Sequence, residues 1–189
     1  MESHPKLPSV AAIVAGEPTR GSWWGYIRAH EIFYVAQQMA SHPDVVITKL
    51  VSKRVTYVHR KLWPAIVAVG SARQNWQLSG LSPTAIELLA LVDKTGRIRT
   101  ERIRIKRSLK KKSAADAARE LEVRLLVHNR EIHTERGTHA KALETWQVWI
   151  GEAGLARKKM LPEDAKRRLE KVLADLNSGF DAEGSLPWN

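Results

Sequence analysis

The chain of 189 residues contains no cysteine. This absence excludes disulfide frameworks, thiol nucleophiles and thiolate zinc sites, and it fits a reducing compartment. Long apolar runs are missing too, since no segment approaches the length that crosses a bilayer and the N-terminus lacks the apolar region of a signal peptide. We therefore expect a cytoplasmic protein that does not enter a membrane.

Acidic side chains are scarce relative to basic ones, with 20 Asp and Glu against 31 Lys and Arg. The net charge of +11 attracts polyanions over a long range. Between Arg97 and Lys112, nine basic residues stand against the lone Glu101: Arg97, Arg99, Arg102, Arg104, Lys106, Arg107, Lys110, Lys111 and Lys112. This basic run predicts a nucleic-acid partner, with duplex DNA favoured.

Glycine-rich phosphate-binding loops are also absent, because neither Gly-x-Gly-x-x-Gly nor Gly-x-x-x-x-Gly-Lys-Ser/Thr occurs. A nucleotide-driven motor is therefore not indicated, and we expect no cofactor.

The second half of the chain has the element order of a winged helix. Ser82-Pro83 is typical of a helix start, and Gly96 ends that helix. Thr100 begins a predicted short second helix, and Ser113 with Asp116 matches a reciprocal helix cap. The helix after Ser113 would be the recognition helix, with Arg119 as its best candidate for a DNA contact.

A hairpin is predicted after Leu126, with its turn at Glu135-Arg136-Gly137. Arg136 at the tip would position the hairpin as a wing on backbone phosphates. An ordinary solvated hairpin is the equally weighted alternative. A final helix from Pro162 to about Leu176 would pack on the domain or on a second subunit, and we expect a loose tail from Ser178 to Asn189, with Trp188 tucked in as the exception.

The first half predicts a helix, a hairpin and a second helix. Apolar residues at helical spacing indicate a helix from Tyr26 to Ser41, and two β-branched runs, Val45 to Val51 and Arg54 to Arg60, indicate the hairpin. The next helix opens at Lys61, and its apolar stripe continues to Trp76.

Trp23 and Trp24 lie between Gly21 and Gly25. We expect these indoles in a core rather than stacked on a flat ligand. His30, Glu31 and His59 are the candidate acid–base residues, because they could converge with the indoles around an extruded base. The favoured alternative is that Glu31 pairs with Arg28 and that His59 bonds within the sheet.

His128, His133 and His139 form a histidine cluster in the predicted hairpin. Their spacings match no common zinc motif, and odd and even positions of a strand face opposite ways. We expect no metal site.

Three sequence segments support a resemblance: Gly-Ser-Trp-Trp-Gly at 21, Thr-Tyr-Val-His-Arg-Lys-Leu-Trp-Pro at 56, and Leu-Leu-Val-His at 125 with His-Thr-Glu-Arg-Gly at 133. In these the chain resembles a group of short bacterial proteins, from which no catalytic residue carries over. The second half is also similar in outline to winged-helix DNA-binding domains, including those of the winged-helix alkylpurine DNA glycosylases, without that group's catalytic signature. The likeness implies fold and partner only.

The sequence thus predicts an α+β protein with a helix-hairpin-helix module in residues 1–80, a winged helix in residues 81–150, and a C-terminal helix and tail in residues 151–189. It would bind nucleic acid, most of all duplex DNA, in repair or regulation. Two alternatives stay open: an enzyme acting on a nucleic-acid base with its site in the N-terminal half, and an RNA- or ribosome-associated factor. A homo-oligomer is compatible with either.

Overall fold

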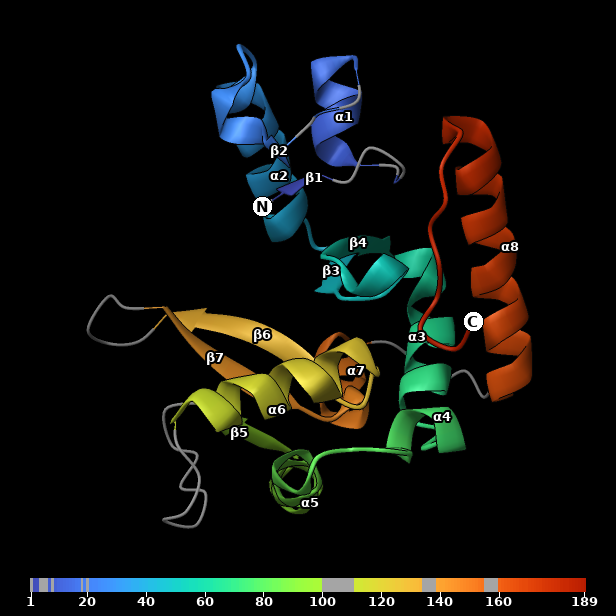
Figure 1. Cartoon of the computed structure of the whole chain (residues 1–189). Coiled ribbons are helices and arrows are strands. Elements are labelled where there is room, and N and C mark those ends of the chain that lie inside the picture. Colours follow the sequence, from blue (N-terminus) through green and yellow to red (C-terminus); the bar gives the residue numbers. More distant parts are fainter. Residues whose placement is uncertain are drawn as a thin grey trace.

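The computed structural model describes residues 2–3, 7, 9–17, 19, 21–99, 111–133, 139–154 and 160–189 (Figure 1). Helices and small antiparallel sheets alternate along the chain, so the predicted α+β class is confirmed. The predicted helix at Thr100 and the predicted turn at residues 135–137 lie outside the described residues.

The first elements form an N-terminal lobe at the upper left of Figure 1. It consists of β1 (Glu2–Ser3), α1 (Val10–Ala15), β2 (Gly21–Ser22), the 3₁₀ helix η1 (Trp23–Gly25) and α2 (Ala29–Ser41). Among the described residues, its buried core contains only Ala11, Trp23, Ala29 and Ile32. The lobe therefore buries little apolar surface for its size.

The predicted hairpin is present as β3 (Val45–Thr48) and β4 (Thr56–His59), with Val45 opposite His59. Both strands are shorter than predicted, because residues 49–55 form the loop, which includes a 3₁₀ helix. The elements around it are η2 (Val51–Lys53), η3 (Arg60–Leu62), α3 (Trp63–Gly70) and α4 (Asn75–Leu78). The predicted continuous stripe to Trp76 is wrong, because α3 ends at Gly70 and Arg73 adopts a left-handed φ of 53° before α4 begins.

The next elements are α5 (Pro83–Thr95), β5 (Arg97–Arg99), α6 (Lys111–Val123), β6 (His128–His133) and β7 (His139–Glu144). The predicted cap of α5 is confirmed, since the Ala85 amide donates to the Ser82 hydroxyl over 3.2 Å. The predicted cap at Ser113 is wrong, because α6 already begins at Lys111.

The three strands form one antiparallel sheet in the order β5-β7-β6. One face of this sheet, which includes Ile98 and Leu143, packs on α5 and α6. The other face meets α7 (Trp146–Glu152), where Arg97 and Arg130 of the sheet pair with Glu152. The sheet thus lies between the helix pair on one side and α7 on the other.

The largest core joins segments from both halves of the chain. It packs Val58 and Ile66 against Trp149 of α7 and Leu169 of α8 (Pro162–Phe180). Trp146 is buried in the same core, and its indole Nε1 donates to the Leu125 carbonyl over 2.7 Å.

The expectation of a loose C-terminal tail is wrong. Helix α8 continues to Phe180, and the following residues run back along it (Figure 1). Leu186 is buried in the largest core, and Trp188 donates its indole hydrogen to Glu170 over 2.8 Å. The expectation that Trp188 is tucked against the domain is confirmed.

Within the described part of the chain, we find no helix with the length and apolar character that a bilayer span requires.

Candidate nucleic-acid interface

Helix α6 offers a narrow exposed strip. Ala117, Ala118 and Leu121 are buried against α5 and the sheet, whereas Asp116 and Arg119 are exposed. Among the residues that the structure describes, no ion pair engages Arg119. Arg119 is therefore an exposed basic residue of α6.

Two other polar side chains of α6, Glu120 and Glu122, bind to neighbouring elements of the fold. Glu120 accepts hydrogen bonds from the Ser82 amide and hydroxyl over 3.0 and 2.7 Å. Glu122 pairs with Lys49 of the hairpin loop over 2.8 Å. On the predicted polar side of this helix, Glu120 and Glu122 thus bind within the fold, whereas Arg119 is exposed.

Arg124, just after α6, is also engaged in the fold. Its guanidinium donates to the Ser79 carbonyl over 2.6 Å and to the Trp76 and Gln77 carbonyls over 3.2 Å each. It therefore ties the end of α6 to the region of α4.

Arg97 lies in a network on the sheet face that meets α7. Its Nε donates to Glu144 over 2.6 Å, and its Nη2 lies 2.7 Å from Glu152. Arg130 of β6 joins the same two carboxylates at 3.2 and 2.9 Å. Two carboxylates thus offset two guanidinium groups, and the placement of Arg97 does not support the predicted contact with a nucleic acid.

Glu144 is the centre of this network and is fully buried. Burial alone would raise the pKa of its carboxyl, but hydrogen bonds from His128 and Arg97 and the charge of Arg130 outweigh burial and lower the pKa. The His128 Nδ1 lies 2.9 Å from a Glu144 oxygen. The hydrogen bond with Glu152 in turn raises the pKa of Arg97.

Most of the predicted basic run lies outside the described residues, namely Arg102, Arg104, Lys106, Arg107 and Lys110; Arg136 also lies outside them. Lys111 and Lys112 form the first turn of α6. Arg99 is exposed near the end of β5, on the same sheet face as Arg97. The nucleic-acid contacts of these residues stay predictions.

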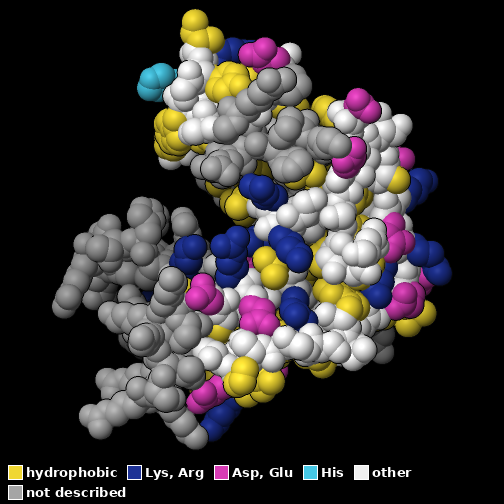
Figure 2. All heavy atoms as spheres, in the orientation of Figure 1, with side chains coloured by type: hydrophobic (Ala, Val, Ile, Leu, Met, Phe, Trp, Pro, Cys, Tyr) yellow, Lys and Arg dark blue, Asp and Glu magenta, His cyan; other side chains and the backbone are white. Residues whose placement is uncertain are grey.

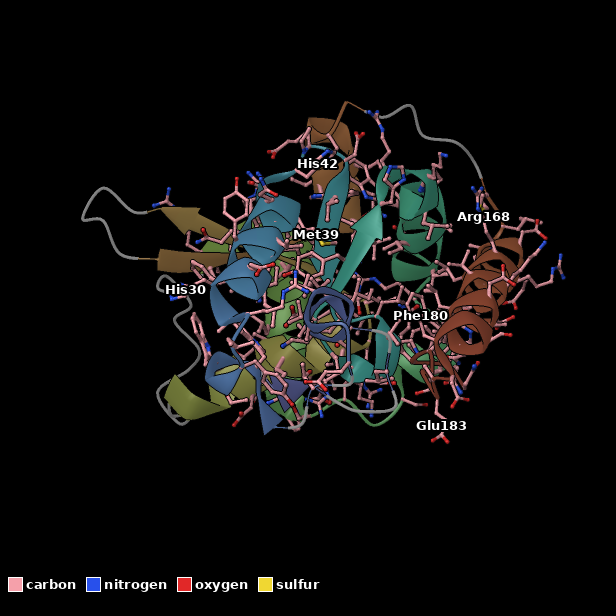
Figure 3. All side chains as sticks on the ribbon, turned by 90° about the horizontal axis from the view of Figure 1, so that it is seen from above. His30, Met39, His42, Arg168, Phe180 and Glu183 are labelled. Carbon is pink, nitrogen blue, oxygen red and sulfur yellow. The ribbon has the colours of Figure 1, made fainter. Side chains whose placement is uncertain are left out.

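The candidate acid–base residues do not assemble into one group. Arg28 donates to Glu31 over 3.0 Å, and this hydrogen bond lowers the pKa of Glu31, as the favoured alternative expected. His59 accepts from the Lys61 amide over 3.3 Å, and His30 projects outward from α2 (Figure 3). Within the described residues, no hydrogen bond or ion pair joins His30, Glu31 and His59 to one another.

The two predicted core tryptophans differ. Trp23 is 5% exposed and belongs to the lobe core, whereas Trp24 is 55% exposed. The core prediction therefore holds for Trp23 and is wrong for Trp24.

Of the histidine cluster, His133 and His139 are paired across the hairpin. The described residues contain no group of three His, Cys, Asp or Glu side chains arranged for a metal ion.

Sequence reasoning missed the Glu144 network. Glu144 precedes Trp146 as a single carboxylate without a motif, and Arg97 lies 47 positions away. The register of the hairpin could have revealed part of this network. A hairpin that pairs His128 with Glu144 places both side chains on one sheet face.

Comparison with protein families gives a match over residues 2–183 to the model described as AlkZ related. No curated protein and no solved structure matches the chain.

Proposed function

The chain belongs to the AlkZ-related family, and from this premise we propose that it binds duplex DNA through a winged helix in residues 81–150. AlkZ is a glycosylase-like protein of DNA repair, so the family name favours DNA as the partner. The proposed role is DNA binding in repair or regulation.

The observation that carries the proposal is the topology of the second half. Helix α5, strand β5, helix α6 and the β6–β7 hairpin follow in an order compatible with a winged helix, and the strands pair in the order β5-β7-β6. The short second helix predicted between β5 and α6 lies outside the described residues. In such a domain, the helix before the hairpin enters the major groove and the hairpin reaches the adjacent backbone. Helix α6 would be that recognition helix.

Exposure and charge support the same conclusion. Arg119 is the exposed cation in the middle of α6, and Lys111 and Lys112 open this helix. Figure 2 shows further Lys and Arg side chains across the middle of one face, below the N-terminal lobe, with Asp and Glu side chains among them. The net charge of +11 supplies the long-range attraction to phosphates.

Arg97 lies outside the proposed contact set, because Glu144 and Glu152 offset its charge. Arg99, Arg102, Arg104, Lys106, Arg107, Lys110 and Arg136 remain in the proposed contact set as predictions.

The test replaces Arg119 and measures duplex binding by fluorescence anisotropy at several salt concentrations. If Arg119 contacts a phosphate, Arg119→Gln weakens binding to all sequences and makes the salt slope shallower by about 1. Arg167→Gln is the matched control, because Arg167 is an exposed arginine of α8 and the substitution removes the same charge. Equal effects of the two substitutions would contradict a specific role of α6.

The family name also favours a second candidate, an enzyme that acts on a nucleic-acid base. Its site would lie in the N-terminal half, with His30, Glu31 and His59 as acid–base residues. Replacing Glu31 by Gln and His59 by Asn would then abolish base release and leave DNA affinity nearly unchanged. Base release that persists in both variants would exclude this set of residues.

An RNA- or ribosome-associated role is distinguished by competition. Duplex DNA should displace a labelled duplex at lower concentration than structured RNA does, and stronger displacement by RNA would favour that role instead.

A further inference from the structure

The N-terminal lobe carries exposed aromatic rings outside its small core. Trp24 is 55% exposed and Phe33 is 40% exposed. We call these two side chains, which contact each other, the aromatic ledge. Large aromatic rings usually provide burial energy in a core, so a group of them on a surface indicates a binding site.

Contacts within the lobe hold the ledge in place. Trp24 stacks on the buried Trp23, with ring centroids 4.1 Å apart and an interplanar angle of 24°. Phe33 of α2 leans on Trp24 at a centroid distance of 5.5 Å. Because Trp23 is fixed in the core, Trp24 loses little side-chain freedom when a ligand binds.

We infer that the aromatic ledge stacks on an unpaired base of DNA, an inference that rests on the proposed function. Every base presents a flat π surface, and aromatic rings bind it with little dependence on sequence. The charge of +11 draws the surrounding phosphates towards the protein. An apolar partner surface would gain nothing from that charge.

The position of the ledge agrees with this ligand. Figures 1 and 3 both place α2 over the ribbon of β6 and β7, next to the proposed winged helix. His30 projects outward from α2 in the same lobe (Figure 3), and it precedes Phe33 by three positions, which places both on one side of the helix. A duplex held by α6 would thus have the ledge on its flank, where a displaced base could reach it.

The experiment compares two labelled duplexes that differ only in a central unpaired adenine. Both are titrated with the full chain at one salt concentration, and the readout is the ratio of the two affinities. Trp24→Ala and Phe33→Ala should lower affinity for the unpaired-base probe by roughly 5- to 100-fold and leave paired duplex binding unchanged. Trp24→Phe, which keeps an aromatic face, should retain most of the wild-type ratio.

Phe180→Ala is the matched control, because Phe180 is 51% exposed and lies at the end of α8, far from His30 in Figure 3. It should leave both affinities unchanged. Phe33→Ala guards against misfolding by Trp24→Ala, because Phe33 does not belong to the buried core of the lobe as described.

Wild-type protein that binds paired duplex with no preference for the unpaired base would overturn this inference and leave the proposed function intact. Ledge variants that keep the wild-type ratio would do the same. If the ledge variants change only the sedimentation of the protein, the ledge contacts a second copy of the chain, and the inference is overturned. Failure to bind either probe would remove both proposals.

Discussion

Gly70 lies where the last residue of α3 meets the buried indole of Trp146. A Cβ at position 70 would stand 2.3 Å from the Trp146 Nε1, 2.4 Å from its Cδ1 and 2.9 Å from the Leu125 carbonyl oxygen. The first two distances lie far inside van der Waals contact, so the indole must move. Moving it breaks the 2.7 Å hydrogen bond to Leu125. We therefore expect Gly70→Ala to destabilise the protein severely.

The magnitude follows from two costs. Overpacking of a filled core costs about 1–3 kcal/mol, and an unsatisfied buried donor costs about 1–3 kcal/mol more. Gly70→Ala should therefore lower the free energy of unfolding by about 2–6 kcal/mol. Urea denaturation followed by tryptophan fluorescence measures this change.

Gly179→Ala is the matched control for this prediction. A Cβ at Gly179, in α8, meets nothing within 4 Å. Alanine is the better helix former, so this variant should be more stable by up to about 1 kcal/mol. A Gly70→Ala variant within about 1 kcal/mol of wild type would refute the reasoning, because it would mean that the core around Trp146 yields without cost.

Two further predictions concern the sheet network and a helix cap. Glu144→Gln should destabilise the protein by about 3 kcal/mol, because it leaves Arg97 and Arg130 without their shared buried partner. Because the folded-state pKa of Glu144 is depressed, its contribution to stability is present above the unfolded pKa of about 4.3 and is lost as pH falls through the folded pKa. Melting temperatures recorded from neutral to acidic pH should fall less steeply for Glu144→Gln than for wild type, and parallel curves would contradict this. Ser82→Ala should cost about 1 kcal/mol, because it removes the cap of α5 and a 2.7 Å bond to Glu120; an unchanged urea midpoint would contradict it.

Features set by neighbouring residues could be predicted from the sequence. The start of α5 at Ser82-Pro83 depends on a hydroxyl and an adjacent proline, and both act within one turn. The end of this helix at Gly96 is equally local, because glycine accepts the observed φ of 73°. The β3–β4 hairpin also followed from pattern alone.

Features set by distant partners could not be predicted. The tail appeared loose because nothing near Trp188 shows that Trp76 will pack against it, with ring centroids 5.5 Å apart. The start of α6 was misplaced because a Ser-to-Asp spacing fits the interior of a first turn as well as a cap.

The candidate site shows the same division. Charge density identified the basic run, but only the folded register shows that Glu144 meets Arg97 and leaves Arg119 exposed on another element. The indoles at 23 and 24 looked equivalent in sequence. The fold separates them, because Trp23 packs with Ala29 and Ile32 while Trp24 stacks on it from outside.

The salt dependence of duplex DNA binding tests the central claim most directly. If about four to six phosphates are engaged, the logarithm of affinity should fall against the logarithm of salt concentration with a slope of roughly −4 to −5. A flat response, or no binding at low salt, would contradict a DNA-binding function for this chain.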